Sequence, residues 1–512
     1  MNSNLYAHLA AAFPADASAC AIETEDGDYY SFDDLERASA MLANLLVRSG
    51  LKAGDRVAAQ VEKSPEALIL YLATIRAGFV FLPLNTAYRE AELTYFLGNA
   101  EPGVVVCSPE NFAWLSKLAF KAGALHVYTL GEHQNGSLLE RAASCSERFT
   151  TVACAPDALA AILYTSGTTG KSKGAMLSHE NLLSNAQALK RAWGWRDGDV
   201  LLHALPLFHV HGLFVACHGA LLSGSKMIFF AKFDAARVVA ELPRATVFMG
   251  VPTYYVRLLA EPGLDQTVCR SMRLFVSGSA PLLEETFRAF AVRTGHTILE
   301  RYGMSETVML LSNPYHGPRL PGTVGMPIEG VAVRVVDGAG LPTPPGSVGE
   351  IEVRGPNVFS GYWRMPEKTR EEFTADGYFK TGDLGRWGLP DGSAPDYLCI
   401  VGRSKDLIIT GGYNVYPKEV ESYLDNLPGV AESAVVGVPH PDFGEAVTAV
   451  VVMKPGVSGD ERALIGALKL AIANFKVPKR IFFAAELPRN TMGKVQKNVL
   501  RERCAAAAKA AA

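Results

Sequence analysis

Several features that would assign a chain to a particular class are missing from this 512-residue sequence. No uninterrupted apolar run approaches the roughly 20 residues that a membrane-spanning helix needs. The eight cysteines, from Cys20 to Cys504, form no C-x-x-C pair, so we expect neither a disulfide framework nor a zinc site. Lys and Arg are spread along a chain of formal net charge −3, which gives no reason to expect nucleic-acid binding.

The N-terminal segment MNSNLYAHLAAAFPADASAC lacks the basic stretch and the long apolar stretch of a secretory signal peptide. We therefore expect a cytoplasmic protein, and scattered cysteines suit that reducing compartment. The composition is that of an ordinary globular protein, with 49% hydrophobic and 20% charged residues. More than one domain is expected, because a single hydrophobic core stops growing well below this length.

Short apolar runs alternate with helix-like segments through much of the chain. The run ALAAILY, residues 158–164, is typical of a buried strand. A glycine-rich loop follows it, and Ser178 can then cap a helix that carries on one face Leu182, Leu183, Ala186, Leu189 and Trp193. The strand pattern recurs at residues 201–208, 226–230, 246–252, 273–279 and 297–303. This alternation predicts an α/β fold of helix-flanked sheets, in which ligands bind beyond the carboxyl ends of the strands.

The composition of the sequence changes near residue 338. Residues 338–363 are rich in Gly and Pro between short β-like runs, which indicates a small β unit. The segment GRSKDLIITGGYNVYPKEVE then precedes a stretch with its own helix and strand patterns. We predict a large N-terminal domain over residues 1–402, which includes the β unit, and a small α+β C-terminal domain over residues 403–512. The boundary lies near Arg403 to Lys405.

The loop YTSGTTGKSKGAMLSHEN, residues 164–181, combines glycines and hydroxyls with two lysines. It does not match the P-loop pattern G-x-x-x-x-G-K-[ST], because Thr165 stands where the first glycine should be. A Gly/Ser/Thr-rich surface turn is the ordinary alternative, since such clusters usually mark loops. The two lysines after a buried strand favour phosphate contact, because the N–H groups of a strand–loop–helix unit point at an anion.

Four further motifs carry reactive or charged side chains. RYGMSET, residues 301–307, offers an aromatic ring, two hydroxyls and a carboxylate after a strand. KTGDLGRW places Asp383 between glycines, GRSKD contains Arg403, and PRNTMGKVQK places Lys494 in a Gly-containing turn. Each has an ordinary explanation when it is taken alone, as a turn cap, a surface ion pair or a solvated lysine.

Together and in this order, the motifs resemble the adenylate-forming superfamily of acyl-CoA synthetases, peptide-synthetase adenylation domains and luciferases. The resemblance covers nearly the whole chain, and it is greatest to the malonyl-CoA synthetase family, in stretches such as HALPLFHVHGLF, GVPTYYVRLL, NVFSGYWRMPEKT and GGYNVYPKE. It implies that a carboxylate attacks the α-phosphorus of ATP, that pyrophosphate leaves, and that the CoA thiolate converts the acyl-AMP to a thioester. The implied acid is malonate, with methylmalonate or another small carboxylic acid as the alternative. The implied cofactors are ATP, Mg²⁺ and CoA.

The resemblance also implies a nucleotide site. The leaving pyrophosphate is held by Thr165, Ser166, Gly167, Thr168, Thr169, Gly170, Lys171, Ser172 and Lys173. Asp383 and Arg403 contact the ribose, and Tyr302 packs on the adenine beside the backbone of Ser279, Ala280 and Pro281. Glu306 holds Mg²⁺ together with Thr168, because a hard cation prefers oxygen ligands near substrate phosphates. Ser305, where family members usually carry Thr, keeps the hydroxyl that contacts the α-phosphate.

The remaining implied roles concern catalysis and a mobile C-terminal domain. Lys494 bridges the carboxylate and the α-phosphate and stabilises the transition state electrostatically. His209 matches a histidine near the acyl pocket, and a histidine that merely closes a strand is the alternative. Lys405 matches the hinge about which the C-terminal domain rotates, first delivering Lys494 and then the segment Gly411 and Gly412 to the pantetheine arm.

The distal carboxylate of malonate cannot be buried without a cation or strong donors. The candidates are Arg257, Arg273, Arg301 and His211, and pocket contacts are also expected from Ser279 and Met309. We favour Arg257, because GVPTYYVRLL lines the acyl pocket in relatives and an Arg fork can hold a carboxylate bidentately. An exposed helix arginine is the alternative. Val210 and Leu310–Leu311 stand where relatives often carry more polar residues, which extends the expected substrates to substituted malonates.

Three other functions stay open from the sequence. One is a ligase for a small monocarboxylic acid, with Arg257 on the surface. Another is a luciferase-like oxygenase, which would need a luciferin pocket. A nucleotide-binding sensor without activity is disfavoured, because Lys494, Glu306 and Asp383 are all present. Since the chain ends shortly after Lys494, we expect a free-standing ligase without a carrier domain, whose partners are a small acid, ATP and CoA rather than nucleic acid or a membrane.

Overall fold

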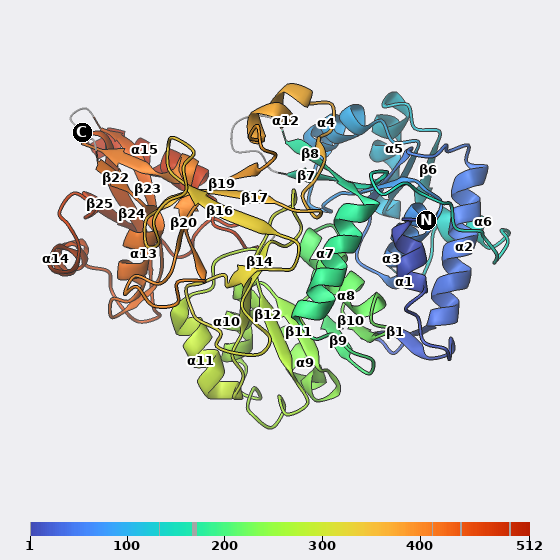
Figure 1. Cartoon of the computed structure of the whole chain (residues 1–512), viewed down its shortest axis with the longest axis horizontal. Helices are drawn as coiled ribbons and strands as arrows, with labels where there is room; N and C mark the ends of the chain where they lie inside the picture. Colours follow the sequence, from blue (N-terminus) through green and yellow to red (C-terminus); the bar gives the residue numbers. More distant parts are fainter. Residues whose placement is uncertain are drawn as a thin grey trace. The chain divides into compact units, whose positions relative to one another are not determined.

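The computed structural model describes residues 2–132, 134–165, 172–411, 413–440, 443–490 and 493–511. These residues form two compact units (Figure 1). Unit 1 comprises Met1–Ala332 and Val353–Phe379, and unit 2 comprises Val333–Glu352 and Lys380–Ala512. The boundary predicted near Arg403 lies within unit 2, where strand β20 (Leu398–Arg403) ends. Of the predicted β unit, residues 338–352 belong to unit 2 and residues 353–363 belong to unit 1.

The first sheet of unit 1 contains the apolar runs that the sequence pattern marks as strands. Its order is β15-β14-β13-β12-β11-β9-β10-β1-β2. The central strands pair in parallel: β9 (Val200–His203), β10 (Lys226–Phe229), β11 (Val247–Gly250), β12 (Leu274–Ser277) and β13 (Leu299–Tyr302). The outer strands are β1 (Cys20–Thr24), β2 (Tyr29–Ser31), β14 (Leu311–Ser312) and β15 (Met326–Pro327). The α/β prediction is confirmed, and the carboxyl ends of the parallel strands meet at one edge.

Helices cover this first sheet and close its core (Figure 1). They include α9 (Ala235–Glu241), α10 (Pro252–Ala260) and α11 (Glu284–Thr294). Tyr255 of α10 and Phe290 of α11 are buried with Phe248 and Phe275 of the strands, and their rings meet edge to face. This rigid packing fixes the strand ends that carry the polar residues described below.

The second sheet of unit 1 has the order β18-β8-β7-β4-β3-β5-β6. Its strands are β3 (Arg56–Gln60), β4 (Val80–Pro83), β5 (Val104–Cys107), β6 (His126–Thr129), β7 (Leu159–Thr165), β8 (Lys173–Ser178) and β18 (Gly361–Tyr362). Helices α4 (Glu90–Ala100) and α5 (Phe112–Lys121) pack against it, and α3 (Pro65–Arg76) is buried along its whole length. A short helix, α12 (Pro366–Glu372), follows β18.

One part of the predicted phosphate site is wrong. The sequence pattern predicts that the glycine loop leads directly into a helix, but β8 intervenes and pairs antiparallel with β7, with Thr165 opposite Lys173. Helix α7 (His179–Ala192) begins only after β8, where Ser178 accepts a hydrogen bond from Asn181 N, as its capping role predicts. The loop is therefore the turn of a hairpin, because KGAMLS pairs with the preceding strand before the chain reaches the helix cap.

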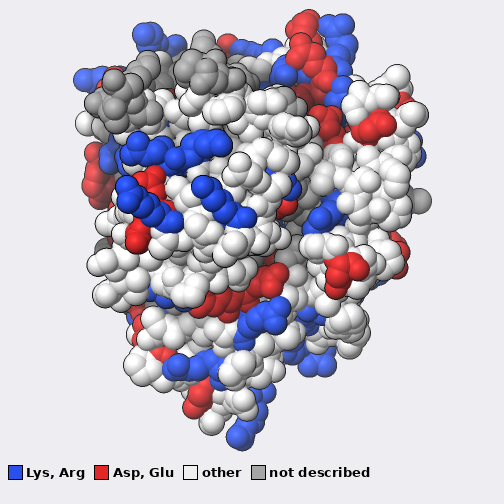
Figure 2. Space-filling model, turned by 90° about the vertical axis from the view of Figure 1, so that its left-hand side faces the viewer, with Lys and Arg blue, Asp and Glu red and all other residues white. Residues whose placement is uncertain are grey.

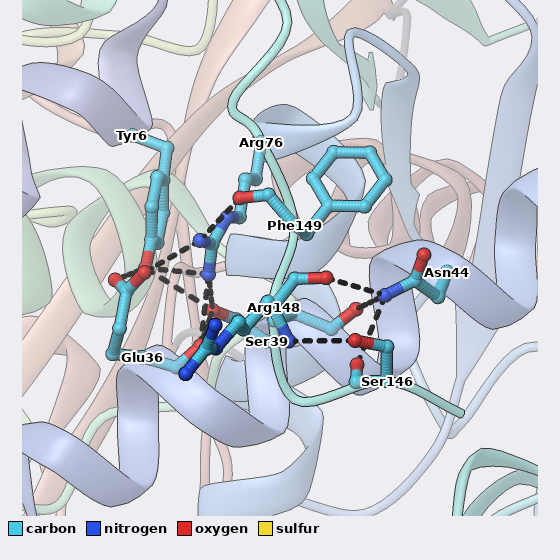
Figure 3. Close-up of polar contacts among 9 residues, drawn as sticks. Tyr6, Glu36, Ser39, Asn44, Arg76, Ser146, Arg148 and Phe149 are labelled. Atoms are coloured by element: carbon cyan, nitrogen blue, oxygen red, sulfur yellow. Dashed lines mark hydrogen bonds and ion pairs between the residues drawn. The ribbon is translucent and has the colours of Figure 1, made fainter. Parts of the chain in front are cut away.

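A buried polar network fixes the N-terminal helices of unit 1 (Figure 3). Arg76, at the end of α3, donates to Glu36 of α2 (Phe32–Arg48) at 2.5 Å, to Ser39 at 2.9 Å and to the carbonyl of Phe149 at 2.8 Å. Tyr6 of α1 (Leu5–Ala10) joins it by donating to Glu36. Nearby, the Asn44 amide donates to the carbonyls of Ser146 and Arg148. The network connects three helices and the chain segment before β7, far from the polar strand ends.

Unit 2 contains two smaller sheets. The first has the strand order β16-β17-β19-β20, and β19 pairs antiparallel with β20. Its strands are β16 (Ala332–Val336), β17 (Gly349–Arg354), β19 (Phe379–Trp387) and β20. The other contains β21 (Ile408–Thr410), β22 (Tyr413–Val415), β23 (Val430–His440), β24 (Gly444–Met453) and β25 (Arg480–Phe483), with helices α13 (Pro417–Asp425), α14 (Glu461–Ala471) and α15 (Lys497–Ala511). The predicted β unit and α+β C-terminal part are thus both present.

Two surface properties concern the partners of the chain. Within the described residues, no helix combines the length and the apolar character that crossing a bilayer requires. On the face drawn in Figure 2, basic and acidic side chains of described residues lie intermixed rather than segregated by sign.

Candidate functional site

The carboxyl edge of the first sheet gathers the polar site residues that the sequence predicts in unit 1. Ser279, Ala280 and Pro281 follow β12, Tyr302 ends β13, and Ser305 and Glu306 come just beyond it. Two residues here adopt positive φ without being glycine, Ser279 at 71° and Val308 at 55°. For a β-branched residue such as Val308 this backbone is strained, and such strain concentrates where a site must be held in one shape.

Arg301 is the principal charged group at this edge. Its residue is only 4% exposed, and its Nε and Nη2 atoms have no hydrogen-bond partner among the described residues. Burial lowers the pKa of Arg301 to about 9, although the neighbouring Glu300 carboxylate opposes the change. The guanidinium lies against Gly278, where a Cβ atom would come within 2.2 Å of Cζ. A buried cation with unused donors is expensive to maintain, so this arrangement suits an anionic ligand.

Two histidines and a serine lie near Arg301. Burial, followed by the charge of Arg301, lowers the pKa of His209 to about 4 and that of His211 well below its usual range. Both imidazoles are therefore neutral near pH 7 and contribute hydrogen bonds rather than charge. Ser279 Oγ lies 3.4 Å from Nδ1 of His211, whose Nε2 has no partner in the described part of the chain. His211 begins the π-helix η2 (His211–Cys217), a geometry often found at functional sites.

The other arginine candidates lie in different environments. Arg273 is bound bidentately to Asp199, with Nε 2.7 Å from Oδ1 and Nη2 2.5 Å from Oδ2. Arg257, the anchor favoured from the sequence, is exposed on α10, whose buried residues are Tyr255 and Leu258. An exposed guanidinium does not need a ligand to compensate for burial, so the structure moves the preference from Arg257 to Arg301. Met309, the remaining acyl-pocket candidate, is buried.

Glu306 is a buried carboxylate whose position depends on residues 359–362. The residue is 5% exposed, its Oε1 accepts from the Tyr362 hydroxyl at 3.0 Å, and its backbone carbonyl accepts from Phe359 N at 2.8 Å. A fixed carboxylate oxygen fits the ligand preference of Mg²⁺. In the sequence this segment contributes only to the family resemblance, and no role is predicted for Tyr362. A tyrosine in GYW, after a glycine- and proline-rich stretch, is the only local signal.

The hairpin turn that carries the phosphate loop is described only at its ends. Ser166, Gly167, Thr168, Thr169, Gly170 and Lys171 lie outside the described residues, as does Gly412 of the C-terminal motif. The Tyr95 hydroxyl donates to the Ser172 carbonyl at 2.8 Å. Lys173 pairs with Glu372 of α12 at 3.3 Å, and its Nζ lies 4.2 Å from the centre of the Tyr362 ring. Both ends of the turn are therefore fixed to unit 1.

Unit 2 brings together the remaining predicted residues. Asp383 and Arg403 face each other across β19 and β20, and Arg403 Nε lies 2.9 Å from Asp383 Oδ1. Loss of water around its ammonium group lowers the pKa of Lys494 to about 8, and the charge of Arg403 adds to this effect while Asp383 opposes it. Lys494 as a residue stays exposed, so the dehydration acts at the ammonium end. Lys405 also influences Lys494 electrostatically, which places these predicted residues in one charged cluster.

The turns of unit 2 hold Lys494 and Gly411 in defined positions. Lys494 N donates to Asn490 Oδ1 at 2.9 Å, and Asn490 N donates back to the Lys494 carbonyl at 2.9 Å. Gly411 has φ 57° and donates to the Phe443 carbonyl at 2.9 Å. The positive φ favours glycine, because a side chain would strain this backbone.

Comparison with known proteins identifies the family of the chain. The model of the AMP-binding enzyme family matches residues 7–363, and the model of the AMP-binding enzyme C-terminal domain matches residues 419–494. The crystal structure of ATP-bound MatB from Rhodopseudomonas palustris is 55% identical over 99% of both chains, with a TM-score of 0.95. The malonate–CoA ligase of Arabidopsis thaliana is 34% identical over 93% of this chain and 85% of its own. The sulfoacetate–CoA ligase of Cupriavidus necator is 34% identical over 93% of each chain. The chain therefore belongs to the AMP-binding enzyme family.

Proposed function

We propose that this protein is an AMP-forming ligase that joins malonate to CoA. One carboxylate of malonate attacks the α-phosphorus of ATP, pyrophosphate leaves, and malonyl-AMP forms. The CoA thiol then attacks the acyl carbon, and AMP leaves as malonyl-CoA is released. Family membership and the names of its relatives support this reaction. The observation that carries the choice of acid is the buried guanidinium of Arg301, whose Nε and Nη2 have no hydrogen-bond partner among the described residues.

Arg301 supplies what a dicarboxylate needs and a monocarboxylate does not. The reacting carboxylate of malonate must stay free to attack phosphorus, so only the distal one can be anchored. Nε and Nη2 of Arg301 can donate to both oxygens of that carboxylate in a fork. Binding then gives the buried cation the partner that it lacks among the described residues, and the neutral His211 and Ser279 complete the polar wall.

The other predicted residues keep their proposed roles around ATP. Thr165, Ser172 and Lys173 at the ends of the loop, with residues 166–171 between them, bind the pyrophosphate. Tyr302 and Ser279–Pro281 receive the adenine, Asp383 and Arg403 the ribose, and Ser305 the α-phosphate. Glu306 would hold Mg²⁺ with Thr168, and the ion supplies positive charge for the phosphate oxygens. Lys494 stabilises charge in the adenylation step.

The roles in unit 2 require movement, which we also propose. Lys405 is the hinge, and after adenylation the segment Gly411 and Gly412 replaces Lys494 at the reacting centre to admit the pantetheine arm. We further propose a cytoplasmic location. The cysteines are free thiols, which suits a reducing compartment.

Substituted malonates are a second candidate for the acid. Val210, Leu310 and Leu311 are buried apolar side chains in the segments that carry His211 and Met309. An apolar wall beside a distal-carboxylate anchor would accept the methyl group of methylmalonate, at a gain of about 0.8 kcal/mol for each buried carbon.

An acid panel tests the proposal. AMP release with CoA present is measured for malonate, methylmalonate, sulfoacetate, propionate and ferulate. Malonate or methylmalonate should give the highest kcat/KM, and a preference for propionate or ferulate would overturn the assignment. Arg301→Met should lower kcat/KM for malonate by about 10²–10³-fold, since it leaves a buried carboxylate unpaired, while it changes propionate little.

Arg257→Met is the matched control, because it makes the same substitution on the exposed face of α10. It should leave the ratio of malonate to propionate activity unchanged. If Arg257→Met changed that ratio and Arg301→Met did not, the original prediction of Arg257 as the anchor would be restored.

A further inference from the structure

Tyr362 lies between the two groups of opposite charge that are assigned to the metal and to the pyrophosphate. It belongs to β18, which pairs antiparallel with β8, so that Tyr362 stands opposite Ala175. On one side its hydroxyl donates to Glu306 Oε1 at 3.0 Å. On the other side, the Lys173 ammonium lies over its ring, with Nζ 4.2 Å from the ring centroid. One side chain thus contacts both groups.

The tyrosine is held rigidly in this place. Its backbone N donates to the Thr369 hydroxyl at 2.9 Å, and the next residue, Trp363, donates to the Gly174 carbonyl at 2.7 Å. The Phe359 ring packs edge to face on the Tyr362 ring at 4.8 Å, and Phe373 and Phe379 pack behind Phe359. The ring therefore has little freedom to move away from its two partners.

The hydroxyl of Tyr362 acts as a donor to Glu306. The hydrogen bond runs from the phenol to Oε1, because an ionised carboxylate can only accept. Glu306 can then remain a charged carboxylate with a fixed orientation, which is what a hard cation needs.

Lys173 pairs with Glu372 rather than with Glu306. Its Nζ lies 3.3 Å from Glu372 Oε1, and Glu372 also accepts the Lys368 ammonium at 3.1 Å. Because Lys368 remains as a partner, Glu372 can release Lys173 to a phosphate without being left unpaired. A direct ion pair between Lys173 and Glu306 would instead neutralise the phosphate-binding cation and the metal-binding anion together.

We propose that Tyr362 is a positioning residue that keeps Lys173 apart from Glu306 and fixes each of the two groups for its own ligand. The hydroxyl orients Glu306 for the metal, and the ring supports Lys173 for the pyrophosphate. The proposal rests on the use of ATP in the proposed function but not on the identity of the acid. Tyr362 contacts neither reacting atom, so its effect is transmitted through Glu306 and Lys173.

Three variants separate the two roles. Tyr362→Phe keeps the ring and removes the hydroxyl, whereas Tyr362→Leu removes both. Tyr128→Phe is the matched control, because it removes a tyrosine hydroxyl that lies 2.8 Å from Ser49 Oγ at the edge of the second sheet. Equilibrium binding of ATP is measured by calorimetry without any acid, first in EDTA and then across a Mg²⁺ series. Mn²⁺ binding in the presence of ATP is followed by electron paramagnetic resonance, and thermal unfolding verifies that each variant is folded.

Tyr362→Phe should bind metal-free ATP within about twofold of wild type but require about tenfold more Mg²⁺ or Mn²⁺, the effect expected for losing a hydrogen bond to a charged group. Tyr362→Leu should show the same metal defect and also bind metal-free ATP roughly three- to thirtyfold more weakly, because the cation–π support of Lys173 is removed. Tyr128→Phe should match wild type.

Two results would overturn the proposal: an unchanged metal requirement in Tyr362→Phe, or metal-free ATP affinity in Tyr362→Leu equal to that of the Phe variant. Failure of wild type to bind ATP at all would overturn both this inference and the proposed function. A wild type that binds Mg²⁺–ATP but prefers a different acid in the panel would overturn only the proposed acid, and the inference about Tyr362 would stand.

Discussion

The functional groups of the two units differ in how their charges are held. In unit 1, Arg301 and Glu306 are almost fully buried, and Arg301 keeps donors that no described residue uses. In unit 2, Arg403 pairs with Asp383 and its side chain is 33% exposed, while Lys494 is exposed. A buried charge without a partner is costly, whereas the buried Asp383 carboxylate of unit 2 has the partly exposed Arg403 guanidinium as its partner.

This difference indicates that the two units have different roles in the reaction. The groups of unit 1 are matched to one ligand, because only an anion of the right shape compensates for the burial of Arg301. The groups of unit 2 are stable with or without a ligand, so they can be presented and withdrawn during a reaction cycle. This comparison supports our proposal that selectivity for the acid resides in unit 1 and that charge stabilisation during adenylation resides in unit 2.

The largest effect should come from a buried arginine of unit 1 that does have a partner. Arg273→Met removes the bidentate partner of the 1% exposed Asp199 carboxylate, which keeps only the hydrogen bonds from Thr246 and Arg196 N and a 4.0 Å contact with the Arg196 guanidinium. The free energy of unfolding should fall by up to about 3–5 kcal/mol. Arg301→Met removes a buried cation without such a partner and should leave stability unchanged or raise it. Urea unfolding of both variants measures the difference. Equal destabilisation would show that an unpaired guanidinium does not mark the ligand site.

The next effect concerns Lys494 in unit 2. Lys494→Ala should slow malonyl-AMP formation by about 10²-fold or more, comparable to the loss of an oxyanion donor. The same variant should still convert supplied malonyl-AMP and CoA to the thioester, because that step uses Gly411 and Gly412. Separate assays of the two half-reactions make the comparison. An equal loss in both would mean that Lys494 supports the fold of unit 2 rather than adenylation.

The sequence predicted the fold well where strands are buried on both faces. The runs around β9–β13 are nearly continuous in apolar residues because both faces of a parallel sheet are covered. β8 was missed because the short KGAMLS segment follows the glycine loop directly and lies before the helix cap at Ser178, so loop and helix looked contiguous. A six-residue strand in a hairpin leaves little periodic signal.

The sequence predicts individual site residues only where a motif contains them, and these assignments stay predictions. Arg301 was a candidate, but its rank depends on burial against Gly278 and on neighbours such as His211, which no local pattern reveals. The sequence favours Arg257 as the carboxylate anchor because its segment, GVPTYYVRLL, resembles one that lines the acyl pocket in relatives. Whether Arg257 is exposed depends instead on which face of α10 is buried. Tyr362 contacts a residue 56 positions away, so its role could not be inferred from spacing.

A smaller effect should appear in the pH dependence of adenylation. Lys494 acts as an ammonium, and its pKa of about 8 means that it is charged below that pH and loses its proton above it. The kcat/KM of malonate-dependent ATP–pyrophosphate exchange should therefore fall as the pH rises through about 8, at up to about tenfold per unit. CoA is omitted, because its own thiol titrates nearby. Lys494→Ala should lack this descending limb, and a limb that persisted in the variant would belong to another group.

The smallest effect should come from the neighbour that lowers the pKa of Lys494. Arg403 repels the Lys494 ammonium, and it also occupies the Asp383 carboxylate that would attract it. Arg403→Gln removes the repulsion and leaves Asp383 available, so both changes raise the pKa of Lys494. The alkaline limb of the exchange reaction should move upward by less than about one pH unit, since a charge pair near the surface contributes on the order of 1 kcal/mol. Weaker binding of the ribose by the same variant would raise the KM for ATP at every pH without moving the limb. A limb that did not move would mean that dehydration alone sets the pKa of Lys494, and the charged groups of unit 2 would then be independent rather than a coupled cluster.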